Sequence, residues 1–113
     1  MDADELQFRV GVSVAAAGSV FTPRGELDVA TQGQLRAVLE QQAEKGSVTL
    51  DLSRLRFMDT SGLRLILETA EAARRDGFTF GVIPGPPAVQ RLFEIAGVSE
   101  LVPFVDAKEG GTP

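Results

Sequence analysis

The hydrophobic pattern switches between two periods along the chain, and these switches restrict the possible folds more than any other feature. Period two, typical of a strand with one buried face, marks the first segment through Leu6, Phe8, Val10, Val12 and Val14. The small residues 15–18 then predict a hairpin turn, and Val20 begins a second strand. Because Pro23 has no N–H, this strand should lie at a sheet edge there or end at Gly25.

Apolar stripes with helical spacing follow, separated by short apolar strands. The stripes lie in residues 35–43, 63–73 and 89–96, and a glycine closes each helix. Strands are predicted in residues 48–52, 78–83 and 101–105, and residues 55–57 only connect to Asp59. The order β-β-α-β-α-β-α-β predicts one α/β domain in which helices cover a mixed sheet. The glycine-rich residues 107–113 should form a disordered tail.

Composition excludes several classes of function. The chain of 113 residues has no cysteine and no histidine, so it lacks disulfides, thiolates and the most common general base and metal ligand. A net charge of -5 disfavours nucleic acid and anionic membrane surfaces as partners. The N-terminus is acidic and the longest uncharged stretch, residues 10–23, is too short to span a bilayer, which favours a cytoplasmic protein.

The chain also lacks the usual motifs of catalysis. It has no P-loop, no dinucleotide fingerprint and no cluster of metal ligands. The acidic residues Glu26 and Asp28 are most simply part of a solvated turn. Asp59 follows a buried strand, as the phosphorylated aspartate of a receiver domain does, but the other acidic pair and the lysine of a receiver are missing. We therefore expect no catalytic residues, no cofactor and no metal site.

The polar residues before the second helix are the strongest candidates for a functional site. Thr60 precedes an apolar helical run, as an N-cap does, and capping would by itself account for its presence. Asp59 and Ser61 are good capping residues too, so the helix start has more polar side chains than a cap requires. Gly62 lowers helix propensity where alanine would raise it. Such departures from local rules often mark a functional site.

Three segments together resemble the STAS-domain anti-sigma factor antagonists of bacteria. They are Gly25-Glu26-Leu27-Asp28, Phe57-Met58-Asp59-Thr60-Ser61-Gly62-Leu63 and Pro87-Ala88-Val89-Gln90-Arg91-Leu92-Phe93-Glu94-Ile95-Ala96-Gly97. The resemblance runs from Leu6 to Phe104, and the three segments occur in the family's order. It implies a STAS-like fold, with residues 1–106 as the single domain.

The resemblance implies a protein that switches partners. Unphosphorylated members bind an anti-sigma factor that is also a serine/threonine kinase, which frees a sigma factor. The kinase ends this binding by phosphorylating the hydroxyl residue after the motif aspartate, and a serine/threonine phosphatase restores it. That residue is Thr60 here, with Ser61 as the second candidate. A STAS regulatory subunit of another assembly, such as a transporter ATPase, is the main alternative, and a small-molecule or nucleotide-binding domain is a more distant one.

The partner-binding surface is expected at the start of the second helix and on its exposed side. Its predicted residues are Asp28, Asp59, Thr60, Ser61, Gly62, Arg64, Leu65 and Glu68. Leu65 falls outside the apolar stripe, so it is either an exposed contact residue or buried under the neighbouring loop. Free N–H groups at the helix start should accommodate a phosphate on Thr60. Its added charge could weaken binding roughly a hundredfold without a change of fold.

Overall fold

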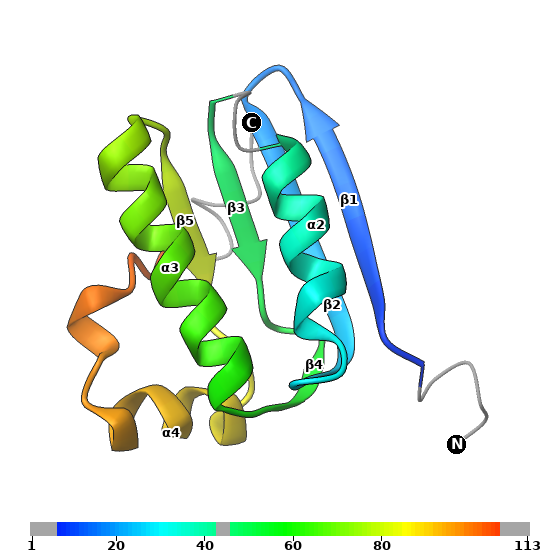
Figure 1. Ribbon diagram of the computed structural model, residues 1–113, viewed down its shortest axis with the longest axis vertical. Helices are drawn as coiled ribbons and strands as arrows, with labels where there is room; N and C mark the ends of the chain where they lie inside the picture. Colours follow the sequence, from blue (N-terminus) through cyan, green and yellow to red (C-terminus); the bar gives the residue numbers. More distant parts are fainter. Residues whose placement is uncertain (1–6, 43–45, 107–113) are drawn as a thin grey trace.

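A five-stranded mixed sheet forms the centre of the structure, a computed structural model that describes residues 7–42 and 46–106. Its strands are β1 (Arg9–Ala15), β2 (Gly18–Leu27), β3 (Val48–Asp51), β4 (Leu55–Met58) and β5 (Phe80–Ile83). The helices are α2 (Gln32–Gln42), α3 (Thr60–Asp76) and α4 (Pro87–Ala96), followed by a short 3₁₀ turn, η2 (Ser99–Leu101). Helices α2 and α3 lie side by side on one face of the sheet, and α4 lies across its lower end (Figure 1).

The strand pairing brings two loop regions to one end of the sheet. β1 pairs with β2 in antiparallel orientation, and the parallel pairs β2–β3 and β3–β5 complete the order β1-β2-β3-β5. β4 pairs in parallel with the last part of β2, where Leu27 lies opposite Met58. Because β2 and β4 run parallel, their carboxyl ends lie together, and the chain leaves both toward a helix.

The helices bury the apolar stripes that the sequence predicts. The buried helical residues include Leu35 and Leu39 of α2, Leu63, Ile66, Ala70 and Ala73 of α3, and Val89 and Phe93 of α4. They pack against apolar strand residues such as Phe21, Leu50 and Val82, each fully buried. Burying one such side chain stabilises the fold by about 1.5–3 kcal/mol. The predicted α/β class, with helices covering a mixed sheet, is confirmed.

Strand β2 continues past the end predicted for it. It runs through Pro23 to Leu27 and lies inside the sheet, between β1 on one side and β3 and β4 on the other. β3 pairs with β2 only as far as Phe21, and β4 pairs only from Gly25 onward. Pro23 therefore lies where one side of β2 has no partner strand, and a residue without an N–H is tolerated there.

Strand β1 buries less of its apolar face than its alternation predicts. Phe8 is buried and Val10 is half-buried, but Val12 and Val14 are 46% and 64% exposed. β1 is the edge strand, and α2 packs on β2 rather than on β1. The end of the hairpin therefore extends beyond the helical cover. Leu6 lies outside the described residues.

The segment after α4 is not the predicted strand of residues 101–105. The chain forms the 3₁₀ turn η2, and in the described part only Phe104 makes a bridge, to Val82 of β5. The ring of Phe104 packs edge-on against Phe93 of α4, with centroids 5.2 Å apart, so aromatic packing anchors this segment. The predicted tail, residues 107–113, lies outside the described residues. Conversely, β4 is a strand where only a connection was expected, because it pairs with the end of β2.

Candidate partner-binding site

Backbone pairing places Asp28 and Asp59 at the same end of the sheet. Leu27 and Met58 are opposite each other in the parallel ladder between β2 and β4, and the two aspartates are the next residues. The Asp59 N–H donates a hydrogen bond to the Leu27 carbonyl at 3.1 Å. The closeness of the two acidic residues therefore follows from the sheet itself.

Asp59, rather than Thr60, caps α3. Its backbone is extended, and its carboxylate Oδ1 accepts a hydrogen bond from the Ser61 N–H at 2.8 Å. Its carbonyl accepts from the N–H groups of Gly62 and Leu63 at 3.1 and 3.2 Å. The prediction that Thr60 acts as the cap is wrong. A carboxylate caps well and also interacts favourably with the positive end of the helix dipole, so the preceding residue takes this role.

The cap changes how the helix start could receive an anion. The N–H groups of Ser61, Gly62 and Leu63 already have an acceptor on Asp59. Of the first-turn N–H groups that were expected to be free, those of Ser61 and Gly62 are therefore occupied, contrary to that prediction. A phosphate on Thr60 would lie in solvent, next in sequence to a carboxylate.

Thr60 is the first residue of α3, and its side chain is exposed. Its hydroxyl has no hydrogen-bond partner among residues 7–42 and 46–106. The neighbouring Ser61 is half-buried. Of the two hydroxyl groups, that of Thr60 is the one more open to another protein.

Asp28 organises the turn that leads into α2. Its Oδ1 accepts hydrogen bonds from the N–H groups of Ala30 and Thr31 at 3.0 and 3.2 Å. The Thr31 hydroxyl donates to the Glu26 carbonyl at 2.7 Å and accepts from the Asp28 N–H at 3.0 Å. Asp28 is half-buried, and its carboxylate therefore supports the loop beside Asp59. The carboxylate of Glu26 is exposed and lies 3.7 Å from Arg56 of β4.

Gly62 is required by close packing. The helix start presses onto the ends of β2 and β4, and Gly62 is buried there. A Cβ at this position would lie 2.6 Å from Met58 Cγ and 2.8 Å from Leu27 Cγ. Its low helix propensity thus has a structural reason, and as a buried residue it offers a partner no side chain.

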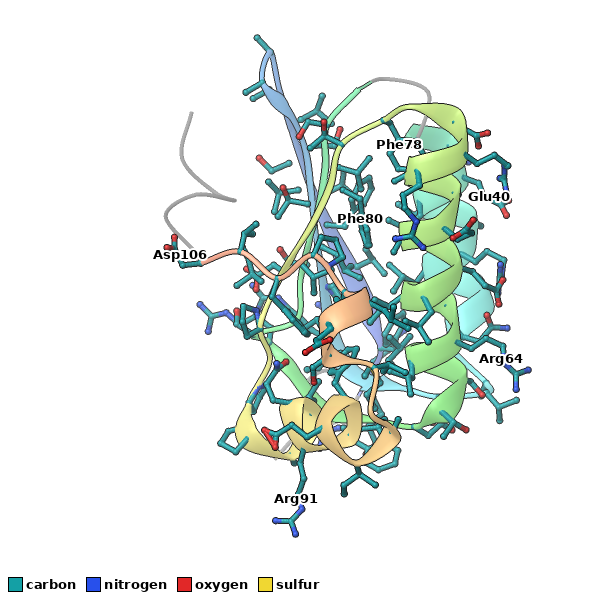
Figure 2. The ribbon with its side chains drawn as sticks, turned by 90° about the vertical axis from the view of Figure 1, so that its left-hand side faces the viewer. Glu40, Arg64, Phe78, Phe80, Arg91 and Asp106 are labelled. Atoms are coloured by element: carbon teal, nitrogen blue, oxygen red, sulfur yellow. The ribbon has the colours of Figure 1, made fainter. Side chains whose placement is uncertain are left out.

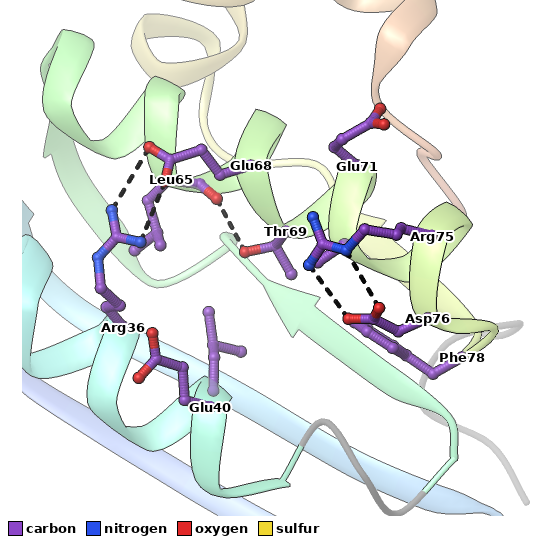
Figure 3. A pocket seen from close by; sticks show the side chains of 11 residues that line it. Arg36, Glu40, Leu65, Glu68, Thr69, Glu71, Arg75, Asp76 and Phe78 are labelled. Carbon is purple, nitrogen blue, oxygen red and sulfur yellow. Dashed lines mark hydrogen bonds and ion pairs between the residues drawn. The ribbon is translucent and has the colours of Figure 1, made fainter.

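The prediction that Leu65 is an exposed contact residue is wrong, because only 2% of it is exposed. The cover is helix α2 rather than a loop. Leu65 and Leu39 line a groove of about 520 Å³ between α2 and α3, shown in Figure 3. At its rim, the Arg36 guanidinium binds both oxygens of Glu68, at 3.1 and 3.5 Å. Glu68, a predicted partner residue, therefore already has a partner within the chain.

The far end of the groove carries a second ion pair, between Arg75 and Asp76 (Figure 3). The hydrogen bonds that Arg75 donates to the Asp76 carboxylate, together with the negative charge of Asp76, raise the pKa of the Arg75 guanidinium. Because arginine is protonated at all physiological pH values in any case, this pair provides no pH switch.

Comparison with known proteins identifies the family. A family model described as "Mlab, STAS domain" matches residues 10–103. The chain belongs to the STAS family.

Curated relatives of this STAS domain include anti-sigma factor antagonists, which confirms the resemblance drawn from the three sequence segments. BtrV of Bordetella bronchiseptica, named as such an antagonist, is 33% identical over 88 residues, 76% of each chain. The anti-sigma F factor antagonist of Paenibacillus polymyxa is 31% identical over 85 residues, 73% of each chain. The crystal structure of an anti-sigma factor antagonist from Mycobacterium paratuberculosis has the same fold, with a TM-score of 0.77, 24% identity and coverage of 87% of this chain and 85% of that chain.

Along α3 of this STAS domain, three of the predicted partner residues form one ridge. Thr60, Arg64 and Glu68 follow one another at intervals of four residues, and all three are exposed. Figure 2 shows Arg64 pointing away from the protein near the start of the helix. Ser61 and Asp59 border this ridge, whereas Leu65 and Gly62 lie below it.

Sequence reasoning missed two exposed apolar residues of this STAS domain. Val29 directly follows Asp28 and is 76% exposed, and Phe57, two residues before Asp59, is 48% exposed. The sequence did contain a signal that Val29 is exposed, because Val29 lies outside every predicted strand and helical stripe. Phe57 gave no such signal, because its exposure depends on β4 lying at the end of the sheet.

Within the described ranges, no three acidic side chains gather closely enough to hold a metal ion. None of the helices in those ranges combines the length and the apolar character of a membrane-spanning segment.

Proposed function

We propose that this STAS domain is an anti-sigma factor antagonist that binds an anti-sigma factor through the start of α3 and is released when Thr60 is phosphorylated. One observation carries the proposal. The Thr60 hydroxyl is exposed and has no hydrogen-bond partner in the described part of the chain, while Asp59 performs the capping. A threonine that caps its helix would have to give up that bond to be modified, and Thr60 does not. The names of the curated relatives support the same role.

The partner is an anti-sigma factor with serine/threonine kinase activity, and a serine/threonine phosphatase restores the binding form. Thr60 is the acceptor in preference to Ser61, because a kinase must surround the hydroxyl and Ser61 is half-buried. The exchange takes place in the cytoplasm, where sigma factors act, and involves neither nucleic acid nor membrane.

The contact surface consists of the exposed ridge on α3 together with its neighbours. Thr60 and Arg64 form its centre, with Asp59 and Ser61 beside them and Glu68 at the far end. Asp28 supports this surface by accepting the hydrogen bonds that hold the neighbouring turn. The exposed side chain of Val29, next to Asp28, provides the apolar contribution that had been expected from Leu65.

Phosphorylation acts through charge. A phosphate adds about -1.5 to -2 charges at neutral pH. Two unit charges about 6 Å apart interact by roughly 2–3 kcal/mol at an effective dielectric constant near 20. Since about 1.4 kcal/mol corresponds to a tenfold change in affinity, repulsion alone could lower affinity by a factor of a hundred or so. A partner that fits the unmodified site would then dissociate, without refolding of the STAS domain.

The proposal is tested by incubating the protein with its cognate anti-sigma factor and ATP. Intact-mass measurement and peptide mapping should find one phosphate, on Thr60. Thr60→Ala should abolish the modification, and Ser61→Ala should keep it. Phosphate on Ser61, or equal modification of Thr60→Ala, would show that the acceptor is wrong. If affinity capture returns a transporter ATPase in place of an anti-sigma factor, the alternative assembly is the correct one.

A further inference from the structure

Arg64 lies one helical turn beyond Thr60 on the same exposed side of α3. Residues four apart are neighbours on a helix surface, since four residues advance it by only about 6 Å. Both side chains are exposed, and Arg64 points into solvent in Figure 2. A long arginine side chain can therefore reach a group carried by the Thr60 oxygen.

The acidic side chains near the start of α3 already have partners other than Arg64. Glu68, the acid one turn further along α3, binds Arg36 of α2 through both carboxylate oxygens. The Asp59 carboxylate accepts from the Ser61 N–H, and that of Asp28 accepts within its own turn. Among the described residues, Arg64 has no ion-pair or hydrogen-bond partner.

We propose that Arg64 forms an intrahelical ion pair with the phosphate carried by Thr60. This inference rests on the proposed function, because it requires that Thr60 be modified. The N–H groups of Ser61 and Gly62 are held by Asp59, which leaves fewer donors of the first turn to compete for the phosphate. The guanidinium offers several N–H donors in a planar fork that matches phosphate oxygens.

The ion pair gives phosphorylation a second effect. It adds negative charge at Thr60, and it also withdraws a cation from the centre of the contact surface. An acidic group of the partner that meets Arg64 in the unmodified protein would lose that contact at the same time. Arg64 thus couples the modification to the surface that the partner recognises.

The test uses protein with phosphothreonine inserted at position 60 during translation, so that no kinase is needed. The phosphate is titrated by ³¹P NMR, and its second pKa is compared between the parent and Arg64→Gln. Pairing with a cation favours the doubly charged phosphate, so Arg64→Gln should raise this pKa by about 0.2–0.4 units at low salt. The matched control is Arg91→Gln, an exposed arginine on another helix, α4, whose side chain points in a different direction from that of Arg64 (Figure 2), and which should leave the value unchanged.

A second measurement reports the contact itself. The ¹H–¹⁵N signal of the Arg64 side chain should move when position 60 carries phosphate, and that of Arg91 should not. Equal effects of the two glutamine variants, or an unmoved Arg64 signal, would overturn the ion pair. Because the phosphate is installed without a kinase, these outcomes are independent of whether an anti-sigma factor modifies Thr60. Failure of the proposed function is therefore recognised separately, by the kinase assay.

Discussion

At the scale of single residues, the start of α3 separates two roles that lie next to each other in the sequence. Asp59 satisfies the N–H groups of Ser61 and Gly62, and the exposed Thr60 hydroxyl makes no hydrogen bond within the described part of the chain. A hydroxyl that is not needed for stability can be modified without weakening the fold. The division of labour between these neighbours therefore makes a reversible switch possible.

The capping hydrogen bond of Asp59 and its negative charge can be tested separately. Asp59→Ala should lower the free energy of unfolding by about 1 kcal/mol, since the Ser61 N–H loses its acceptor. Asp59→Asn, which removes the charge but keeps a good capping oxygen, should cost only a few tenths of a kcal/mol. Urea unfolding of both variants measures the difference. Equal losses would show that charge, and not the cap, stabilises this helix start.

Gly62 provides a second prediction, because packing and helix propensity oppose each other there. Gly62→Ala should destabilise the protein by about 1–3 kcal/mol, since the added Cβ would clash with Met58 and Leu27. Gly33→Ala in α2 is the matched control. A Cβ at Gly33 meets nothing within 4 Å. That variant should be neutral or stabilising by up to about 1 kcal/mol. Thermal unfolding that ranks the two variants the other way would contradict the packing argument.

At the scale of elements, α3 is covered on more than one side. Its apolar stripe faces the sheet, and Leu65 faces α2. What remains exposed near its start is the ridge of Thr60, Arg64 and Glu68. The position of α2 therefore decides which part of α3 a partner can touch.

The contact between α2 and α3 should depend on Leu65 far more than on the ion pair above it. Leu65→Ala should destabilise the protein by about 2–4 kcal/mol, as expected for a buried leucine. Glu68→Gln should cost at most about 0.5 kcal/mol, because its ion pair with Arg36 is exposed. Leu101→Ala makes the same chemical change at a residue that is 55% exposed and should cost much less. Urea unfolding of the three variants would refute this ranking if Glu68→Gln proved as costly as Leu65→Ala.

At the scale of the whole molecule, the proposed switch adds charge to a protein that is already acidic, with a net charge of -5. A general increase in negative charge would slow association with any acidic partner. The proposed mechanism instead requires that the position of the new charge matters. The effect of where the new charge lies can be tested separately from the effect of the total charge.

Thr60→Glu should weaken binding of the anti-sigma factor at least tenfold and leave stability unchanged, since Thr60 is exposed and unbonded in the described part of the chain. Thr79→Glu adds the same charge at an exposed threonine before β5 and should bind like the parent. The loss caused by Thr60→Glu should shrink as salt is raised. Isothermal titration at two ionic strengths measures both effects, and equal losses for the two variants would refute a local switch.

Several features followed from local sequence alone. The change of period located the helices and most strands, because one buried face imposes a regular spacing of apolar residues. The polar run around Thr60 and its order relative to the other two segments indicated the family, which the comparisons confirm. The α/β class with a mixed sheet was also predictable, since the alternation of elements determines how they can be layered.

Other features depended on which element covers which, and no local pattern contains that information. Leu65 is buried because α2 lies over it, and Val12 is exposed because none of the helices in the described residues covers the end of β1. Gly62 is needed because residues far away in sequence, at the end of β2, press against it. Spacing along the chain tells which side chains share a face. Only the packing of distant segments determines whether that face meets another element, a partner protein or water.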